Sequence, residues 1–350
     1  MTKIPVRRLL TARTSAFLVG VFIALVAAEV SLRIYNYFRP SLIFRSKPTR
    51  YEQWHGAPNT WVNETDRLNS HGYNGHEYTT KKTPGMYRII GIGDSFAFGV
   101  VRQRDNYLTL LEQKLRAAGK SAEVINMGIP ATGPPDYLEI VRREGLSLDP
   151  DMVLVCFFVG NDFDESRPSP RRPGSGFFVA RLLRYMTRRQ RAFQGLAIGS
   201  PPRVDTAPTF TSEYFRKLEK QRSFIFEKDN AEFETDLKYA MAPLLEINRL
   251  CQKRGTKFVV VIIPDELQVN PALRKTIVAT LSDRKFDFEQ ANRQLSSELA
   301  KNGISVLDLT PEFESSPQNQ SLYKPLDSHW NIAGNTLAAD KIFEFLKPRL

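Results

Sequence analysis

The chain has 350 residues, of which 42% are hydrophobic and 25% are charged, proportions typical of a folded globular protein. Lysine and arginine number 49 against 38 aspartate and glutamate residues, which gives a formal net charge of +11 at pH 7. Such a surplus attracts nucleic acids, anionic lipids or acidic polymers. No zinc-finger spacing, aromatic RNA-binding strand or basic heptad accompanies it, so we expect no nucleic-acid partner.

The N-terminus carries a basic segment followed by an uncharged apolar run from Thr14 to Ala28. Extended through Tyr37, the run reaches the length of a membrane-spanning helix, about 17–25 residues, with Glu29 near one end. The basic flank predicts a cytoplasmic N-terminus and an exported body. We predict a single-pass membrane anchor within residues 1–40. The alternative is a signal peptide cleaved near residues 26–28, which would secrete the protein.

Residues 41–86 form a polar, turn-rich lead-in, in which we expect a hairpin or two. Its three histidines lack the i,i+4 spacing of a metalloprotease pair. The two cysteines, Cys156 and Cys251, lack the spacing of a metal site and are typical of buried core positions. We therefore predict neither a metal site nor a cofactor.

From residue 87 onward, short apolar strands alternate with amphipathic helices. The predicted strands are "MYRIIGIG", "AEVINMG", "DMVLVCFFVG", "KFVVVIIP" and "ISVLDL". Nearly continuous apolar strands separated by helices are typical of a parallel sheet covered on both faces. The sequence predicts a doubly wound, flavodoxin-like α/β/α domain over residues 87–350, with a parallel sheet of about five strands.

An insertion at about residues 164–234 interrupts this alternation. Its segment 177–193, "FFVARLLRYMTRRQRAF", mixes aromatic residues with five arginines: Arg181, Arg184, Arg188, Arg189 and Arg191. The pattern predicts a basic amphipathic helix, which could lie on an anionic membrane surface, form a lid over a site, or be a solvated insertion.

Polar residues follow the predicted strands where parallel sheets of this kind bind their ligands, beyond the carboxyl ends. Ser95 follows the first strand, Gly128 the second and Asn161 the third. Asp327 and His329 precede the last helix. We expect these residues to meet at one edge of the sheet.

Their chemistry is complementary. A serine hydroxyl needs a base to become a nucleophile, and His329 could serve Ser95. The histidine in turn needs a carboxylate to orient its ring, and Asp327 lies two residues before it. The Ser95 and Gly128 N–H groups and the Asn161 side chain are candidate donors for an oxyanion hole. Position 97 is alanine, so the G-x-S-x-G nucleophile elbow is absent.

These blocks resemble those of the SGNH hydrolases, also called the GDSL esterase/lipase superfamily. "GDSFAFG" resembles the serine block at Ser95, with phenylalanine in place of the leucine of GDSL. Gly128 resembles the glycine block and "GND" at 160–162 the asparagine block, while "DSHWN" at 327–331 resembles the histidine block. The resemblance covers roughly residues 66–348. The lead-in "LNSHGYNGHEY" resembles that of bacterial, membrane-attached members.

One feature departs from the usual family pattern, because the aspartate precedes the histidine by two residues rather than three. The resemblance implies acyl-ester chemistry. It is compatible with a serine esterase that removes an acyl group, in particular acetyl, from an extracytoplasmic carbohydrate or lipid. It is also compatible with an O-acetyltransferase acting on an envelope polysaccharide. A catalytically silent module that binds an envelope polymer is the third possibility.

Overall fold

The computed structural model describes residues 6–38, 49–63, 65–168, 176–183, 185–187, 205–228, 230–281 and 283–350. The chain divides into two compact units. One comprises Met1–Gln53 with Pro170–Ala192, and the other Trp54–Ser169 with Phe193–Leu350.

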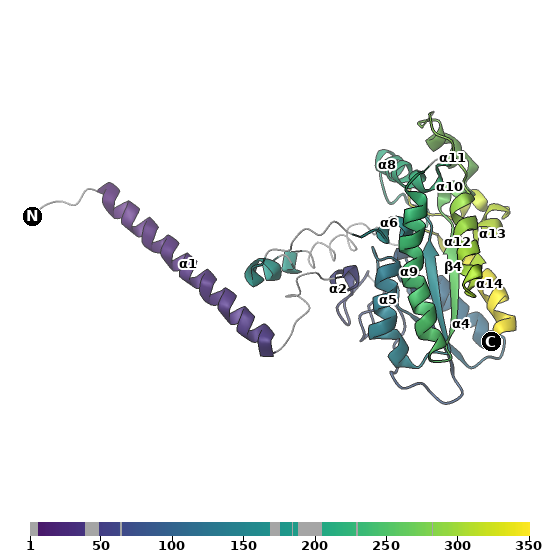
Figure 1. Cartoon of the computed structure of the whole chain (residues 1–350), viewed down its shortest axis with the longest axis horizontal. Helices are drawn as coiled ribbons and strands as arrows, with labels where there is room; N and C mark the ends of the chain where they lie inside the picture. The colour runs from purple at the N-terminus through teal and green to yellow at the C-terminus, as the bar shows by residue number, and fades with distance from the viewer. Residues whose placement is uncertain are drawn as a thin grey trace, which may run out of the picture. The chain divides into compact units, whose positions relative to one another are not determined.

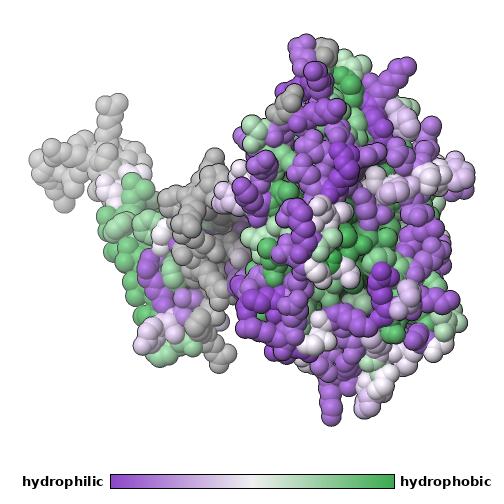
Figure 2. Space-filling view, turned by 45° about the vertical axis from the view of Figure 1, so that its right-hand side comes forward, coloured by the Kyte–Doolittle hydropathy of each residue, from purple (hydrophilic) through white to green (hydrophobic). Residues whose placement is uncertain are grey.

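The first unit is dominated by one long helix, α1 (Val6–Phe38). Its segment Thr14–Phe38, 25 residues long, is apolar enough to cross a membrane, and no residue of its most apolar stretch is fully buried in the protein. Figure 2 shows hydrophobic residues gathered along this helix. A signal sequence would have the same length and composition, so the helix fits both alternatives. Residues 178–183 and 185–187 are also helical, whereas Arg184, Arg188, Arg189 and Arg191 lie outside the described residues.

The second unit is built on a five-stranded parallel sheet in the order β2-β1-β3-β4-β5. In Figure 1 the sheet, of which β4 is labelled, lies among the helices of this unit. The strands are β1 (Tyr87–Gly93), β2 (Ala122–Asn126), β3 (Met152–Phe158), β4 (Lys257–Ile263) and β5 (Ser305–Asp308). This confirms the predicted doubly wound fold. The order reverses between β1 and β3, which is where such sheets open a crevice for ligands.

The helices cover both faces of the sheet. The longer ones are α4 (Tyr107–Ala117), α5 (Pro134–Arg143), α8 (Ser212–Arg222), α9 (Phe233–Gln252), α11 (Pro271–Val278), α12 (Gln290–Lys301) and α14 (Ile332–Leu346). The shorter ones are α2 (Arg50–Trp54), α3 (Ser95–Phe98), α6 (Asp162–Glu165), α10 (Glu266–Val269) and α13 (Thr310–Glu314). Helices α4 and α14 pack together, and α9 packs against both α5 and α12.

The core explains why these segments form strands. All seven residues of β3 are buried, because helices cover both of its faces. Beneath α4 and α14 lies a continuous cluster that includes Ile89, Leu111 and Ile342. Each such side chain contributes about 1.5–3 kcal/mol by leaving water. Both cysteines are buried free thiols, Cys156 within this core.

The lead-in belongs structurally to the sheet-containing unit from Trp54 onward. Within its described residues, 49–63 and 65–86, it has one isolated antiparallel bridge, Trp61 to Arg67, where we expected hairpin strands. Turn-forming glycine, asparagine and proline residues interrupt the pairing. The segment packs inward instead, and the Asn74 side chain donates a hydrogen bond to the Phe98 carbonyl at 2.7 Å.

Candidate active site

The turn after β1 presents Ser95 as the first residue of α3. Asp94 caps this short helix, and its Oδ1 accepts the Phe96 N–H at 2.9 Å. A side chain at Gly93 would crowd the Ala97 methyl group and the Cys156 carbonyl, so glycine permits the close approach of α3 to the sheet. The cap and the glycine together hold the serine at the end of the strand.

The Ser95 hydroxyl lies against His329. Its Oγ is 2.7 Å from His329 Nε2, although 234 residues separate the two in the chain. On the other side of the ring, Nδ1 is 2.6 Å from Asp327 Oδ1. In the tautomer whose Nδ1–H donates a hydrogen bond to Asp327, Nε2 carries no hydrogen and accepts a hydrogen bond from the serine hydroxyl. The structure thus brings together the three residues expected to form a triad.

A backbone turn allows the Asp327 carboxylate to reach the His329 ring although only one residue lies between them. Leu326 has a φ of 49°, in the left-handed region that a branched side chain rarely occupies. This turn brings the Asp327 carboxylate back toward its own loop, where Oδ1 also accepts the His329 N–H at 3.1 Å. The carboxylate therefore reaches the ring although Leu326 occupies the usual position of the acid.

Asp327 is ionised over the whole ordinary pH range. Burial by itself would raise its pKa, but the adjacent His329, through charge and hydrogen bonding, outweighs burial and lowers the pKa to about 2. The side chain is only 3% exposed, and that of His329 is 18% exposed. A fixed negative charge thus faces Nδ1 and stabilises the ring when it takes up a proton.

Gly128 lies directly beside the serine turn, in the loop after β2. A side chain at this position would collide with the backbone of Ala97 and Phe98, so the loop can approach α3 only with glycine. Its N–H donates to Asn126 Oδ1 at 2.9 Å. Gly128 therefore lies beside α3, and its N–H, which we expected to serve as an oxyanion donor, binds a side-chain acceptor within the protein.

Asn161, in the loop after β3, points its amide toward the serine turn. Its Nδ2 donates to Asp94 Oδ2 at 3.2 Å. An amide nitrogen carries two hydrogens, so a second N–H is available for a ligand oxygen. The Ser95 N–H, at the first position of α3, lacks an intrahelical acceptor and is a second donor. Both N–H groups are therefore able to donate to a ligand oxygen.

Asp162, the last residue of "GND", has a structural role. It is fully buried and accepts the Tyr137 hydroxyl at 2.9 Å and the Phe158 N–H at 3.0 Å. Burial raises its pKa well above the ordinary value. This side chain ties the loop after β3 to α5 and so fixes the position of Asn161.

Sequence reasoning missed Arg222, at the end of α8. Its guanidinium donates to the Ser328 hydroxyl, between Asp327 and His329, and lies 5.2 Å from the centre of the Phe158 ring. Glu219 Oε1 is 3.5 Å from Arg222 Nη1. Arg222 thus joins the insertion to the histidine loop. No local sequence signal marks it, because the contact spans 106 residues.

Asn126 is a second residue that the motifs did not identify. Its Nδ2 donates to the carbonyls of Ala97 at 2.6 Å and Asn74 at 3.2 Å. Because its Oδ1 accepts from Gly128, one side chain links the lead-in, the serine turn and the glycine loop. A polar residue at the end of a buried strand is the signal that could have revealed it.

Three buried carboxyl groups lie near this edge. Glu219 and Asp265 are fully buried and Glu266 is 8% exposed. Burial raises the pKa of all three, that of Glu266 to about 8. Among the described residues, no group of three or more His, Cys, Asp or Glu side chains is arranged to hold a metal ion. Burial thus disfavours the charged form of all three acids.

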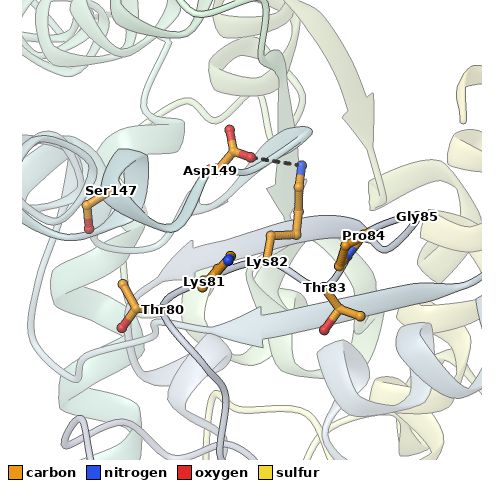
Figure 3. A pocket seen from close by; sticks show the side chains of 8 residues that line it. All are labelled: Thr80, Lys81, Lys82, Thr83, Pro84, Gly85, Ser147 and Asp149. Carbon is orange, nitrogen blue, oxygen red and sulfur yellow. Dashed lines mark ion pairs between the residues drawn. The ribbon is translucent and has the colours of Figure 1, made fainter.

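An open depression of about 570 Å³ lies elsewhere, at the amino ends of the strands (Figure 3). It is lined by Thr80–Gly85, Ser147 and Asp149. Its most prominent cation, Lys82, lies 3.4 Å from Asp149 and 3.0 Å from Asp151. The depression is thus at the opposite edge of the sheet from Ser95, and the charge of Lys82 is paired with two aspartates.

Residues 225–350 match the family model described as "SGNH hydrolase-like domain, acetyltransferase AlgX". This part of the chain is thus similar to an SGNH hydrolase-like domain. The matched residues hold Asp327 and His329 but not Ser95. No curated protein matches the chain.

Solved structures similar to this chain include esterases of low sequence identity. An acetyl xylan esterase is 16% identical, with 74% of this chain and 99% of that chain covered and a TM-score of 0.42. A lipase/acylhydrolase from Enterococcus faecalis is 16% identical, covers 76% and 97%, and has a TM-score of 0.39. A two-domain esterase active on acetylated mannans is 14% identical, covers 75% and 49%, and has a TM-score of 0.40.

Proposed function

We propose that this protein is a serine esterase that removes an acyl group, in particular acetyl, from an extracytoplasmic carbohydrate or lipid. The hydrogen-bonded series from Asp327 through His329 to the Ser95 hydroxyl carries the proposal. Serine, imidazole and carboxylate in this order activate a hydroxyl for acyl transfer.

In the first step the Ser95 Oγ attacks the ester carbonyl while His329 Nε2 takes up the hydroxyl proton. The Ser95 N–H and the second Asn161 Nδ2–H stabilise the oxyanion of the tetrahedral intermediate. The bond from the carbonyl carbon to the leaving oxygen breaks, and His329 returns the proton to that oxygen. An acyl-serine and a free alcohol result.

In the second step a water molecule attacks the acyl-serine, and His329 accepts one of its protons. The intermediate collapses to release the carboxylic acid and return the proton to Ser95 Oγ. Throughout, the negative charge of Asp327 stabilises the protonated ring, which is why a permanently ionised acid is needed there.

The test is labelling with a fluorophosphonate, which reacts with activated serines without requiring the natural substrate. We expect the purified protein to be labelled on Ser95 alone and the label to be lost in Ser95→Ala and His329→Ala. Ser166→Ala, at another buried serine, is the matched control and should keep the label. A folded protein that takes no label at Ser95 would refute the esterase and favour a silent polymer-binding module.

A second candidate, an O-acetyltransferase acting on an envelope polysaccharide, is favoured by the AlgX description of the matching family model. It uses the same acyl-serine but passes the acyl group to a sugar hydroxyl instead of water. Incubating the enzyme with p-nitrophenyl acetate and alginate or xylan separates the two. Acetylated polymer formed in proportion to p-nitrophenol release indicates transfer, whereas free acetate alone indicates hydrolysis.

We further propose that α1 is retained as a membrane anchor and that the region from residue 41 onward lies outside the cytoplasm. The length of the apolar segment Thr14–Phe38 supports this assignment. Mass spectrometry of the protein recovered from membranes tests it. An N-terminal peptide containing Thr14 indicates an anchor, and a new terminus near Glu29 indicates signal cleavage.

A further inference from the structure

A carboxylate within the apolar segment of α1 binds the insertion. Glu29 accepts the N–H groups of Phe178 and Val179, each at 2.9 Å, on its two separate oxygens. Phe178 and Val179 begin the helical residues 178–183, and the first N–H groups of a helix have no acceptor within it. The carboxylate and the helix start therefore satisfy each other.

Arg33, one turn further along α1, strengthens the same contact. Its Nε donates to Glu29 Oε1 at 2.8 Å and its Nη2 to the Gly176 carbonyl at 2.9 Å. Its guanidinium also lies 4.8 Å from the centre of the Phe178 ring. Three hydrogen bonds and one cation–π contact thus join segments that lie far apart in the sequence.

The position of the contact along α1 places it at a membrane surface. With a rise of about 1.5 Å per residue, Glu29 lies about 22 Å beyond Thr14 and Arg33 about 28 Å beyond it. A hydrocarbon core is about 30 Å thick, so a helix that enters it near Thr14 leaves it close to Arg33. A carboxylate at that depth is costly without partners, and the insertion supplies them.

The bound segment has the surface of an interfacial helix. Its large apolar side chains point outward, with Phe177 67% exposed and Leu183 and Met186 each 58% exposed. Arg181 lies among them, and the sequence continues with four more arginines up to position 191. Apolar side chains beside cationic ones are typical of helices that lie in the interface of an anionic membrane.

We propose that residues 176–183 and 185–187 form a second membrane contact, lying in the outer lipid–water interface and held to α1 by Glu29 and Arg33. The proposal depends on α1 being a retained anchor, but not on the esterase activity. Its partner is the lipid of the bilayer that α1 crosses, because the segment is attached to α1 where that helix leaves the hydrocarbon core.

The test places an environment-sensitive fluorophore at Leu183→Cys in the full-length protein, reconstituted into vesicles of phosphatidylcholine and phosphatidylglycerol. The native cysteines are buried and react slowly. We expect blue-shifted emission and strong quenching by lipids that carry a quencher near the headgroup. The same label at Gln294→Cys, on the exposed side of α12, is the control and should report water.

Adding Glu29→Gln should abolish most of the quenching at position 183, since an uncharged amide cannot accept two helix N–H groups on two oxygens. Glu298→Gln, a surface substitution of the same kind, should leave the quenching unchanged. Extraction at alkaline pH monitors the anchor, and fluorophosphonate labelling of Ser95 independently monitors the proposed catalytic function.

Two results would overturn the inference. One is water-like emission at position 183 in protein that resists alkaline extraction, which would leave the anchor intact and remove the second contact. The other is complete extraction of the protein, which would remove both. Neither depends on whether Ser95 is labelled, so failure of the esterase proposal is recognised separately.

Discussion

The amino edge of the sheet, where the strands begin, and the carboxyl edge, where they end, differ in how their buried charged groups are paired. At the amino edge, Arg88 is fully buried and donates to Glu123 at 2.7 Å and to three backbone carbonyls. At the carboxyl edge, the buried acids Glu219 and Asp265 have a weaker cationic partner, since Glu219 Oε1 lies 3.5 Å from Arg222 Nη1. Burial raises the pKa of both carboxyl groups, because the charged form is disfavoured away from water. The amino edge therefore pairs its buried charge closely, whereas the carboxyl edge holds buried acids whose charged form is disfavoured.

The largest effect on activity should come from removing the charge of Asp327 at the carboxyl edge. Asp327→Asn keeps the size of the side chain but removes the charge that orients and stabilises the His329 ring. We expect kcat for an acetyl ester to fall by about 10³–10⁴-fold, with the free energy of unfolding little changed. Asp340→Asn, on the partly exposed side of α14, is the control. Full activity in Asp327→Asn would mean that another group orients the histidine.

Removing the buried charge of Arg88 at the amino edge should instead lower the stability of the fold and leave the activity unchanged. Arg88→Met leaves Glu123 and three carbonyls without their donor, and should lower the free energy of unfolding by ~3–5 kcal/mol. Any fully folded enzyme should keep the kcat of the wild type. Arg104→Met, at a side chain that is 72% exposed, should change stability by less than ~0.5 kcal/mol. Urea unfolding and ester hydrolysis measured on the same samples distinguish the two edges.

The buried acid Glu266 at the carboxyl edge should make the free energy of unfolding depend on pH. Burial raises the pKa of Glu266 from 4.5 to about 8. Between these values the folded state holds a proton that the unfolded chain has lost, so stability falls as pH rises through this window and then levels off. Glu266→Gln removes this dependence and can still accept the Asn270 amide hydrogen. Relative to wild type, it should gain roughly 2–4 kcal/mol between pH 5 and pH 8.

Urea unfolding at both pH values measures this gain. Glu298→Gln, a surface substitution, should show the same pH dependence as wild type. A constant difference between Glu266→Gln and wild type at both pH values would show that Glu266 is ionised in the fold.

The smallest effect should come from Arg222, which acts on the site through Ser328. Arg222→Lys keeps the charge but loses the planar fork, so we expect kcat and the rate of fluorophosphonate labelling to fall about tenfold, with KM unchanged. Ser328→Ala should reproduce the loss, and Arg216→Lys, on the exposed side of the same helix, should not. A change in KM alone would assign Arg222 to substrate binding instead.

Much of the fold could be predicted because the signals are local. The apolar strands and helical periodicities give the α/β/α architecture, and parallel strands bring their following loops to one edge. That reasoning placed Ser95, Asn161 and His329 near one another. It could not place Arg222 or Asn74, because their contacts depend on how the insertion and the lead-in pack. Nor could it foresee that Asn126 accepts the Gly128 N–H, or that Leu326 adopts a left-handed backbone that brings Asp327 to the ring.

The separation of 234 residues between Ser95 and His329 has a consequence for biosynthesis. Chains grow from the N-terminus, and parallel strands pair only when their crossover helices have formed. A growing chain that already displays its serine therefore has no base to activate it until β4, β5 and the histidine loop have been made. Under the proposed mechanism, Ser95 therefore becomes reactive only once the sheet and its histidine loop are complete.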